Sequence, residues 1–384
     1  MNQKKLPVSI DQLLPCYAGY DAIGTHVTSL NKLLVERGFK SNVFAEIVGK
    51  NVPLSVGSAE DYFDNPRRSD SIVIYHYSTG SMIPCRLYGA TSFRITNYHN
   101  ITPPIYFSSP GEEQARAATR HGRNQIPMVK TCTDATWTES RYNANELESV
   151  GFPKSELFPI LRDYQALSNQ PVNAALEQRL KGNRKNILFV GRVAPNKAPH
   201  DLFFLLKQYQ KFVDPNVRLI LVGFSQSPYA QISLKNLAKD LELTLAEDLS
   251  RAAIDSADIL MPGQVSDIDL ASIYRASDVF TCLSDHEGFC VPLVESMYFG
   301  IPIIAHNATA VPETLGNGGL IVEKSDVVAT IEGLSALLSS PGVNQHYRNK
   351  ALERSKRFNW STIVAEFDAA LEKTLQSYYR SRGI

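Results

Sequence analysis

Short apolar runs separated by polar segments follow one another along the first part of the chain. Apolar runs of four to eight residues that are bounded by turn residues are typical of buried strands. The longer segments between several of these runs are predicted to be helices, and strands that alternate with helices indicate a parallel α/β sheet. The runs cover residues 8–14, 41–46, 72–77, 93–98 and 131–136.

A second series of apolar runs begins at residue 186, after a polar stretch over residues 159–185 in which the apolar rhythm is lost. We expect the linker between two domains within this stretch. The predicted domains are residues 1–162 and residues 163–361, each an α/β domain, followed by a last helix over 362–384. The predicted strands of the second domain are 186–190, 217–222, 257–261, 279–283 and 301–305, and its predicted helices include 199–212, 267–276 and 328–338.

The stretch from residue 279 to residue 305 is predicted to be a strand, a loop, a helix and a strand. Pro292 suits the first helical position because its ring fixes φ and its missing N–H is not needed there. The helix is predicted to end at Gly300. In parallel sheets such loops lie at the carboxyl edge, where ligands bind. Backbone N–H groups from Gly288 to Val291, including those of Phe289 and Cys290, would suit an anion there.

Two carboxylates belong to the same stretch, since Glu287 precedes the predicted helix and Glu295 lies in its first turns. Carboxylates beside an anion site make sense if the ligand also carries hydroxyl groups that donate hydrogen bonds. A nucleotide sugar has both features. The alternative is an acidic first turn that the helix dipole favours and that binds nothing.

Cations and glycines follow other predicted strands. Arg192 comes directly after the strand 186–190 and Lys197 follows five residues later, which would place two cations for a pyrophosphate at the same edge as Glu287. Surface cations near a turn are the plain alternative. The loop after the first strand, over residues 15–24, contains Gly19 and Gly24. Their spacing is not that of the dinucleotide fingerprint, so a structural turn and a ligand contact both stay open.

His99 follows the predicted strand 93–98 and precedes a loop stiffened by Pro103 and Pro104. At the carboxyl edge of a sheet, a histidine can hydrogen-bond a sugar hydroxyl or titrate near neutral pH. A structural histidine with satisfied hydrogen bonds is the alternative.

The arrangement Glu287-Gly288-Phe289, then Pro292, then Glu295 resembles the donor site of retaining glycosyltransferases of family 4. The run Tyr98-His99-Asn100-Ile101-Thr102-Pro103 is similar to the segment of polysaccharide mannosyltransferases that places a histidine beside the transferred sugar. The resemblance implies the GT-B fold, in which two Rossmann-like domains face each other across a cleft and the C-terminal helix crosses back to the first domain. Cys290 departs from the glycine that frequently follows Phe in the family.

The resemblance also implies a reaction, the retaining transfer of a sugar from a nucleotide diphosphate sugar without a metal ion or other cofactor. We expect mannose from GDP-mannose, moved to a saccharide or polyprenyl-linked oligosaccharide in bacterial surface polysaccharide assembly. A UDP- or dTDP-sugar donor and a catalytically silent nucleotide-sugar-binding protein are the alternatives. The resemblance implies that Glu287 holds the sugar hydroxyls, that His99 orients the sugar, and that Arg192 and Lys197 stabilise the leaving diphosphate. Glu295 would bind the ribose, and the residues that would bind sugar or phosphate are Gly288, Phe289, Cys290 and Val291. Gly263 and Val265 would lie beside the base, and Gly19 and Gly24 would contact the ligand from the first domain.

Composition removes several other classes of function. The 39 basic and 39 acidic residues balance, which removes the electrostatic case for a nucleic-acid-binding protein. No apolar run approaches the ~20 residues that span a bilayer, and the start of the chain lacks the apolar core of a signal peptide. We therefore expect a cytoplasmic protein, with peripheral association at the cytoplasmic face of the membrane left open. The five cysteines are odd in number and widely spaced, so we expect reduced core thiols and neither disulfides nor a zinc site.

Overall fold

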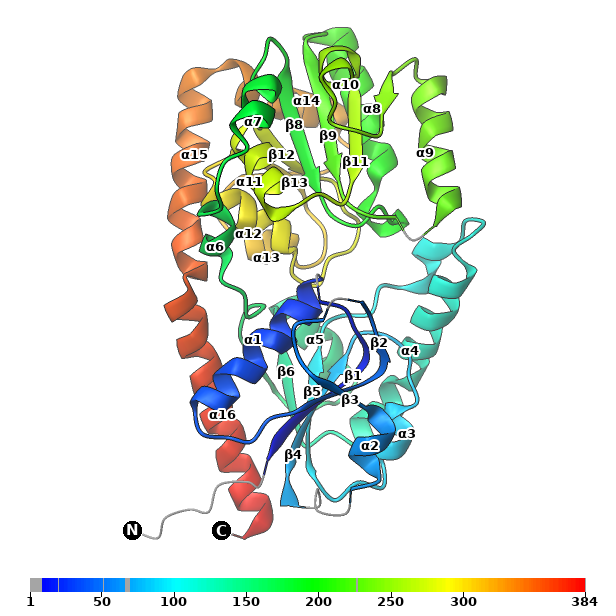
Figure 1. Cartoon of the computed structure of the whole chain (residues 1–384), viewed down its shortest axis with the longest axis vertical. Helices are drawn as coiled ribbons and strands as arrows, with labels where there is room; N and C mark the ends of the chain where they lie inside the picture. The colour runs from blue at the N-terminus through cyan, green and yellow to red at the C-terminus, as the bar shows by residue number, and fades with distance from the viewer. Residues whose placement is uncertain (1–8, 20, 51, 66–69, 226, 384) are drawn as a thin grey trace. The chain divides into compact units, whose positions relative to one another are not determined.

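The computed structural model describes residues 9–19, 21–50, 52–65, 70–225 and 227–383. The chain divides into two compact units (Figure 1). Unit 1 comprises Met1–Ile105, Gln114–Arg162 and Trp360–Ile384, and unit 2 comprises Tyr106–Glu113 and Asp163–Asn359.

Unit 1 is built on a parallel sheet that has seven strands within the described residues. Helices connect most of these strands, as expected for parallel strands that need crossover connections. In the order in which they pair, the strands are β3 (Val56–Ser58), β2 (Val43–Val48), β1 (Ile10–Tyr17), β4 (Ile72–Tyr77), β5 (Phe93–Tyr98), β6 (Ala135–Thr138) and β7 (Ser155–Leu157). The helices are α1 (Ala22–Glu36), α2 (Ala59–Phe63), α3 (Ile83–Leu87), α4 (Glu113–Thr131) and α5 (Arg141–Ser149), and the short η2 (Pro104–Phe107) runs into the segment that is assigned to unit 2.

Unit 2 contains a second parallel sheet, also of seven strands in the described part of the chain. Its strands pair in the order β10 (Leu245–Ala246), β11 (Ile259–Gly263), β9 (Val217–Val222), β8 (Lys185–Val190), β12 (Val279–Cys282), β13 (Ile303–His306) and β14 (Leu320–Val322). Its helices are α6 (Tyr164–Ser168), α7 (Ala174–Leu180), η3 (Pro195–Lys197), α8 (Pro199–Phe212), α9 (Pro228–Asp240), α10 (Arg251–Ser256), α11 (Asp267–Arg275), α12 (Val291–Tyr298), α13 (Val311–Leu315), α14 (Val327–Ser339), α15 (Pro341–Ser355) and η4 (Lys356–Phe358).

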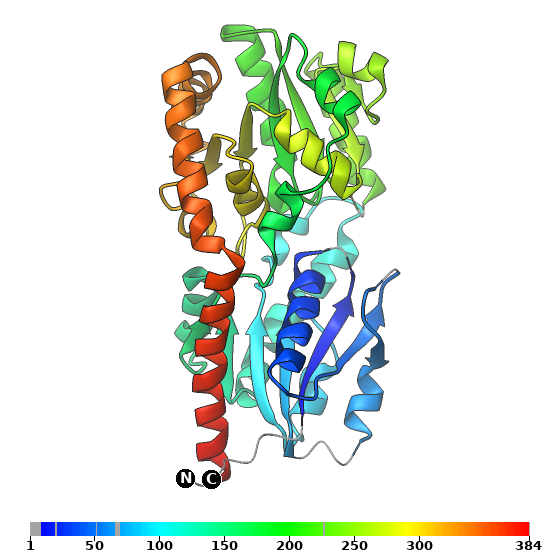
Figure 2. The same cartoon turned by 60° about the vertical axis from the view of Figure 1, so that its left-hand side comes forward.

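The last helix, α16 (Trp360–Arg382), belongs to unit 1 although it follows unit 2 in the chain. Figure 2 shows it as a long red helix beside the strands of unit 1. The indole N–H of Trp137 on β6 donates to the hydroxyl of Thr374 at 2.9 Å. Phe367 packs edge-on against Trp137 and Phe158 in the core of the unit. The predicted return of the C-terminal helix to the first domain is therefore confirmed, and the helix begins two residues earlier than predicted.

Several strands and helices were predicted correctly because their apolar runs are continuous and buried. The strands β4, β5 and β9 and the helix α8 have the predicted bounds. Two other predictions in unit 1 were wrong. The first strand continues to Tyr17, so the predicted loop over residues 15–24 is much shorter, and Val8 lies outside the described residues. The predicted strand over residues 131–136 begins only at Ala135, because α4 continues through Thr131.

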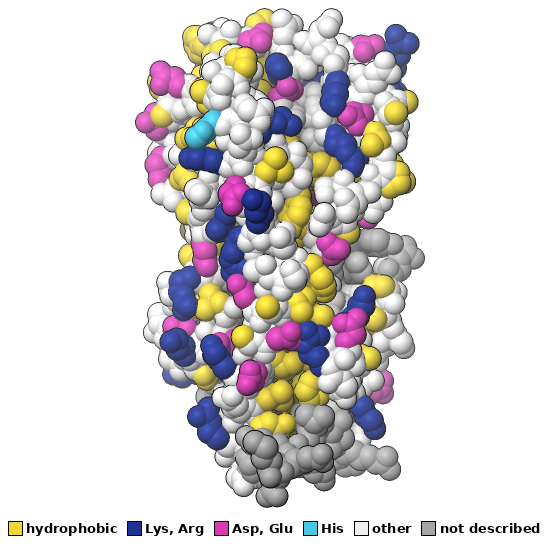
Figure 3. Space-filling view, turned by 90° about the vertical axis from the view of Figure 1, so that its left-hand side faces the viewer, with side chains coloured by type: hydrophobic (Ala, Val, Ile, Leu, Met, Phe, Trp, Pro, Cys, Tyr) yellow, Lys and Arg dark blue, Asp and Glu magenta, His cyan; other side chains and the backbone are white. Residues whose placement is uncertain are grey.

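The surface and the cysteines complete the description of the fold. Figure 3 shows basic and acidic side chains intermixed over one face. Among the described residues, no helix is both long and apolar enough to cross a membrane. The five cysteines are free thiols, and Cys132, Cys282 and Cys290 are buried as expected. Cys16 and Cys85 are exposed, which corrects the expectation of five core thiols.

Candidate functional site

The predicted strand, loop, helix and strand are confirmed in unit 2 as β12, the loop over residues 283–290, α12 and β13. We call residues 283–290 the donor loop. The helix begins at Val291, and Pro292 therefore occupies its second position and not the first. Gly300 follows the helix with a φ of +60°, a conformation that glycine adopts without steric cost. The loop lies at the carboxyl ends of parallel strands, where ligands bind in sheets of this kind.

An ion pair joins the donor loop to the loop after β8 at this edge of the sheet. Glu287 is buried, and its Oε2 lies 2.5 Å from the Nζ of Lys197. The backbone N–H of Glu287 donates to the hydroxyl of Thr309 at 2.8 Å, which fixes the backbone that carries the carboxylate. The structure thus brings together two predicted site residues, with a carboxylate and an ammonium group in direct contact.

Asn196 holds the loop after β8 against the donor loop. Its backbone oxygen accepts hydrogen bonds from the N–H groups of Asp285 at 2.9 Å and His286 at 3.3 Å. Its side-chain amide donates to the backbone oxygen of His286 at 3.1 Å. Asn196 precedes Lys197 and His286 precedes Glu287, so these bonds set the positions of both charged residues. The sequence interpretation missed Asn196, although its place beside Lys197 was a usable signal.

The other predicted ligand-binding residues of unit 2 surround this pair less closely. Arg192 is exposed directly after β8, and among the contacts of the described residues none joins it to Glu287 or Lys197. Gly263 ends β11 with a φ of +74°, and its backbone oxygen accepts from the N–H of Gly223 at 3.0 Å. Val265 is half-buried in the following loop.

Glu295 lies in α12 and is only 4% exposed. Its Oε2 accepts a hydrogen bond from the hydroxyl of Tyr274 on α11 at 2.8 Å. The Tyr274 ring in turn stacks on Phe299, with ring centroids 4.8 Å apart. One oxygen of Glu295 therefore serves the packing of α11 on α12, a role that the sequence interpretation did not anticipate beside the predicted ribose contact.

Residues other than glycine with a positive φ gather beside the predicted site residues. Such a conformation costs roughly 1–2 kcal/mol and persists only where the surroundings impose it. Among the described residues, four of the five cases follow or contact a predicted site residue or belong to the donor loop. They are Asn100 after His99, Ala198 after Lys197, Cys290 in the donor loop, and Thr309, which bonds the backbone of Glu287. At Cys290 the φ of 72° is one that the family's frequent glycine would adopt more easily.

His99 follows β5 in unit 1, and its side chain is 2% exposed. Its Nδ1 lies 2.7 Å from Oε1 of Glu139, and its Nε2 lies 2.8 Å from Nδ1 of His76. The Nε2 of His76 contacts Oε1 of Gln12 at 2.9 Å. The Nε2 of His99 is therefore engaged inside unit 1, whereas its Nδ1 lies close to Glu139 without forming a hydrogen bond. The contact of this buried ring with a sugar stays a prediction.

His26 lies beside the same rings, with its centroid 5.3 Å from that of His99. Its Nδ1 accepts a hydrogen bond from the backbone N–H of Leu161 at 3.0 Å, and its Nε2 lies 2.9 Å from the side-chain amide nitrogen of Asn97. Burial, and then the neighbouring His99, hold the pKa of His26 well below its usual value. His26 is therefore a neutral ring.

Two groups of side chains in the described residues have the types and spacing of metal ligands. They are His26, His76 and His99 in unit 1, and Cys282, Glu287 and Cys290 in unit 2. In the first group, both ring nitrogens of His26 already contact other groups, Nδ1 the N–H of Leu161 and Nε2 the amide of Asn97. In the second group the carboxylate already pairs with Lys197. The chemistry of these donor sets therefore favours hydrogen bonds and ion pairs over a metal ion.

The loop that contains Gly19 and Gly24 is shorter than predicted. Gly24 lies in the first turn of α1, and its N–H donates to Oδ1 of Asp21 at 2.6 Å. A Cβ at this position would lie 1.7 Å from the backbone oxygen of Ala18. Close packing of the helix start on the end of β1 therefore explains this glycine without a ligand. Gly19 lies in the short turn between the two elements.

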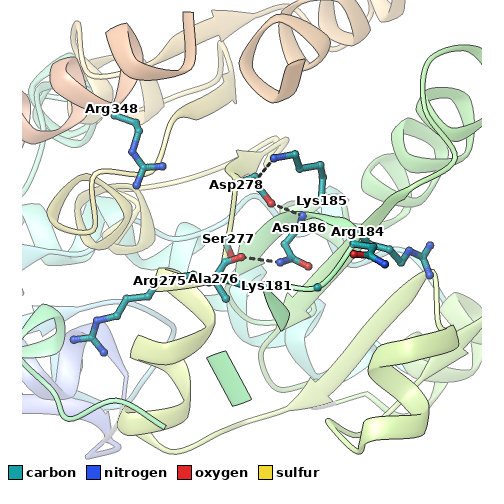
Figure 4. A pocket seen from close by; sticks show the side chains of 11 residues that line it. Lys181, Arg184, Lys185, Asn186, Arg275, Ala276, Ser277, Asp278 and Arg348 are labelled. Carbon is teal, nitrogen blue, oxygen red and sulfur yellow. Dashed lines mark hydrogen bonds and ion pairs between the residues drawn. The ribbon is translucent and has the colours of Figure 1, made fainter. Parts of the chain in front are cut away.

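A pocket of about 370 Å³ lies at the opposite, amino edge of the sheet in unit 2 (Figure 4). Its lining includes Lys181, Lys185, Asp278 and Arg348. Lys185 is paired with Asp278 at 2.9 Å, so part of the positive charge of the pocket is neutralised. Since Lys185 begins β8 and Glu287 follows β12, this pocket is separate from the donor loop.

The comparisons with known proteins agree with this geometry. A family model described as "Glycosyl transferases group 1" matches residues 174–354. The O-antigen chain mannosyltransferase B of Escherichia coli is 31% identical over 104 residues, which cover 27% of each chain. The GDP-mannose-dependent alpha-(1-6)-phosphatidylinositol monomannoside mannosyltransferase of Mycolicibacterium smegmatis is 24% identical over 318 residues, 74% of this chain and 79% of the relative.

A solved structure shows the same fold. HepE of Anabaena, in complex with UDP-glucose, superposes with a TM-score of 0.70 at 16% identity and covers 95% of this chain and 99% of its own. Two parallel α/β sheets and a C-terminal helix that returns to unit 1 are the elements of the predicted GT-B fold, which is confirmed. In sequence, the matched segments span 27% to 42% of the length of several curated relatives.

Proposed function

Because the chain belongs, through residues 174–354, to the glycosyl transferases group 1 family, we propose that it transfers a sugar with retention of configuration from a nucleotide diphosphate sugar. The observation that carries this proposal is the contact between Lys197 and Glu287 at the carboxyl edge of the sheet in unit 2. Both residues lie inside the matched segment. A cation for phosphate and a carboxylate for hydroxyl groups are what a nucleotide sugar requires at one place.

The ion pair suggests a separate role for each of its two residues. In the structure Lys197 and Glu287 neutralise each other, which avoids leaving either charge buried and unpaired. A bound diphosphate would offer Lys197 a new anion, and Glu287 would then accept hydrogen bonds from the sugar hydroxyls. As the glycosidic bond breaks, negative charge grows on the leaving diphosphate, and a cation fixed beside it lowers the barrier. Arg192 is exposed on the same loop and would supply the second positive charge.

GDP-mannose is our preferred donor. The names of two relatives support it, since one is an O-antigen chain mannosyltransferase and another is a GDP-mannose-dependent mannosyltransferase. The complex of HepE with UDP-glucose supports the alternative of a UDP-sugar. We propose unit 1 as the acceptor-binding unit, with a saccharide or polyprenyl-linked oligosaccharide as acceptor. A lipid-linked acceptor would bring the protein to the membrane surface.

Thermal unfolding with GDP, GDP-mannose, UDP and UDP-glucose, each in the presence of EDTA, tests the proposal. A ligand at about 100 times its dissociation constant stabilises a protein by roughly 2.7 kcal/mol. We expect GDP and GDP-mannose to raise the melting temperature without a divalent metal, and Lys197→Met to abolish the shift. A rise in melting temperature with UDP or UDP-glucose alone would overturn GDP-mannose as the donor. If none of the four compounds raised the melting temperature, the proposed reaction class would be overturned. If a compound bound but no sugar were transferred, the protein would be a nucleotide-sugar-binding protein and not a transferase.

A further inference from the structure

Two buried thiols meet at the base of the donor loop. Cys282 is the last residue of β12, and Cys290 ends the donor loop directly before α12. Cys282 is 1% exposed and Cys290 is 7% exposed. Their Sγ atoms lie 3.9 Å apart, within hydrogen-bonding distance for sulfur, although the two residues are eight positions apart in the chain. The contact between the sulfur atoms therefore joins the two ends of the loop that carries Glu287.

The two cysteines are held unequally. The strand β12 lies between β8 and β13, and Cys282 pairs with Ala305 on β13, so the sheet fixes its backbone. Cys290 lies outside the sheet, and its side chain makes no hydrogen bond to the first turn of α12. Its φ of 72° is a conformation that residues other than glycine adopt only where the surroundings impose it. A change at the sulfur contact would therefore move Cys290 and not Cys282.

The sulfur contact also lies beside the ion pair of the donor loop. The sulfur atoms of Cys282 and Cys290 and a carboxylate oxygen of Glu287 all lie within 4.8 Å of one another. The carboxylate of Glu287 pairs in turn with Lys197. A displacement of Cys290 would therefore reach both charged groups that we propose for the donor, and it would shift the N–H groups at the start of α12.

The surroundings of the two sulfur atoms make them chemically different. The hydrogen bond with Cys290 lowers the pKa of the Cys282 thiol, and the Sγ of Cys282 also lies 3.4 Å from the hydroxyl of Ser284. The same bond, and then burial, raise the pKa of Cys290. The thiolate is the reactive form of cysteine, so Cys282 is the attacking sulfur and Cys290 is the second thiol that a reversible disulfide requires. The low exposure of both residues favours a small oxidant such as a peroxide over another protein.

We propose that Cys282 and Cys290 form a modification site, at which a small peroxide converts the two thiols into a reversible disulfide. The Cys282 thiolate attacks one oxygen of hydrogen peroxide, the O–O bond breaks, and the sulfenic acid of Cys282 forms. The hydroxide that leaves takes up the proton of the Cys282 thiol and becomes water.

The second step closes the disulfide. The sulfur of Cys290 attacks the sulfenic sulfur, the S–S bond forms and the S–O bond breaks, so that a hydroxide and the proton of Cys290 leave as a second water molecule. The two thiols thus lose two electrons, which reduce the peroxide to water. A dithiol reductant restores both thiols by exchange.

The disulfide would change the donor loop. A covalent bond requires the two sulfur atoms to approach more closely than the 3.9 Å of their present contact. Since the sheet fixes Cys282, Cys290 and the start of α12 move, and Glu287 is displaced from Lys197. We expect weaker donor binding and slower transfer in the oxidised chain. The effect on the donor rests on the proposed function, whereas the formation of the disulfide does not.

Peptide mass spectrometry of the full chain tests the modification. The chain carries Cys16→Ser and Cys85→Ser, because these two thiols are exposed and would react first. After treatment with hydrogen peroxide near neutral pH and alkylation of the remaining thiols, we expect a cross-link between Cys282 and Cys290 that dithiothreitol removes. Cys132 is the matched control within the same chain, since it is also buried but burial raises the pKa of its thiol to about 11. It should stay reduced.

Two variants in this background separate the steps. Cys290→Gly removes the second thiol and introduces a residue that adopts a positive φ without steric cost, so the sulfenic acid of Cys282 should accumulate and react with dimedone. Cys282→Ala removes the attacking thiol and should leave Cys290 reduced. For the transfer reaction, we expect peroxide to lower kcat/KM for the donor by about 10- to 100-fold in the chain with both thiols, and dithiothreitol to restore it. Cys282→Ala should be insensitive to peroxide.

Each outcome decides a separate claim. Absence of the cross-link after peroxide would overturn the modification site, as would oxidation of Cys132 at the same rate. If Cys282→Ala does not fold, Cys290→Gly still shows whether Cys282 is the attacking sulfur. Unchanged activity of the cross-linked chain would refute the effect on the donor loop. A chain that forms the cross-link but transfers no sugar even when reduced would refute only the proposed function.

Discussion

Lys197→Met should destabilise unit 2 more than Glu287→Gln, and the double variant should recover part of the loss. At 2.5 Å and an effective dielectric constant of about 20, the two charges attract by about 7 kcal/mol. Desolvation of both ions offsets most of this attraction. The side chain of Glu287 is 8% exposed and that of Lys197 is 18% exposed, so Lys197→Met leaves the more deeply buried charge without its partner.

From these exposures we expect a loss of about 3 kcal/mol in the free energy of unfolding for Lys197→Met. We expect about 1–2 kcal/mol for Glu287→Gln, because an amide oxygen still accepts a hydrogen bond from the ammonium group. The double variant should be about 2 kcal/mol more stable than the sum of the single losses predicts. Lys181 and Glu177 provide a matched control in the same unit, since they also lie 2.5 Å apart but Lys181 is 53% exposed. Their coupling should be only about 0.3–0.5 kcal/mol.

Urea unfolding followed by far-ultraviolet circular dichroism measures these free energies, and hydrogen exchange of peptides over residues 185–198 and 284–299 locates the change. The chain has two tryptophans, Trp137 and Trp360, and both belong to unit 1. Tryptophan fluorescence therefore follows the other unit and should be unchanged in Lys197→Met, Glu287→Gln and the double variant. If the Lys197 and Glu287 changes add within about 0.5 kcal/mol, like the exposed control, the reasoning that treats this pair as desolvated is refuted.

Two other predictions follow from the described contacts. Glu287→Gln should mainly lower kcat, because its hydrogen bonds matter most in the transition state, whereas Glu295→Gln should mainly raise the donor KM; the opposite pattern would mean that the two carboxylates have exchanged roles. In the folded chain the pKa values of His26 and His76 lie well below 6.5, so the unfolded chain binds more protons than the folded chain at acidic pH. The free energy of unfolding of unit 1 should therefore fall as pH drops below about 6.5, by up to roughly 2.7 kcal/mol per pH unit for the two rings together. Urea unfolding read by tryptophan fluorescence between pH 7 and pH 5 measures this, and a flat profile would contradict it.

The elements that were predicted well are those whose sequence pattern and burial coincide. The strands β5 and β9 are short apolar runs buried in parallel sheets, and a continuous run of this kind needs no knowledge of its neighbours. The predicted strand at residues 131–136 failed because its threonines suit a strand locally, while the helix α4 continues through Thr131. The helix α15 was missed because its apolar residues do not form one face, although Pro341 after Ser340 is a helix start signal.

The candidate site also contains residues that a local sequence pattern indicates and residues that it does not. Glu287, Lys197 and His99 were proposed as site residues because strand ends mark the carboxyl edge of a sheet. The partners of His99 were not found, because a pattern along the chain does not show which side chains of adjacent strands meet. His76 lies near the end of a correctly predicted strand, so a comparison of polar residues at neighbouring strand ends could have paired it with His99. Glu139 was hidden by the shifted start of β6.

The place of α16 bears on how the protein is made. Trp137 and Thr374 are separated by 237 positions in the chain, and all of Asp163–Asn359 is synthesised between Arg162 and the start of α16. Domains usually fold in the order in which they leave the ribosome. Here the core of unit 1 lacks Phe367, Ala370 and Leu371 until the last helix emerges, while the residues of β8 to α15 are already complete. The second unit can therefore reach its native state first, and the apolar face that α16 covers stays open to chaperones throughout that interval.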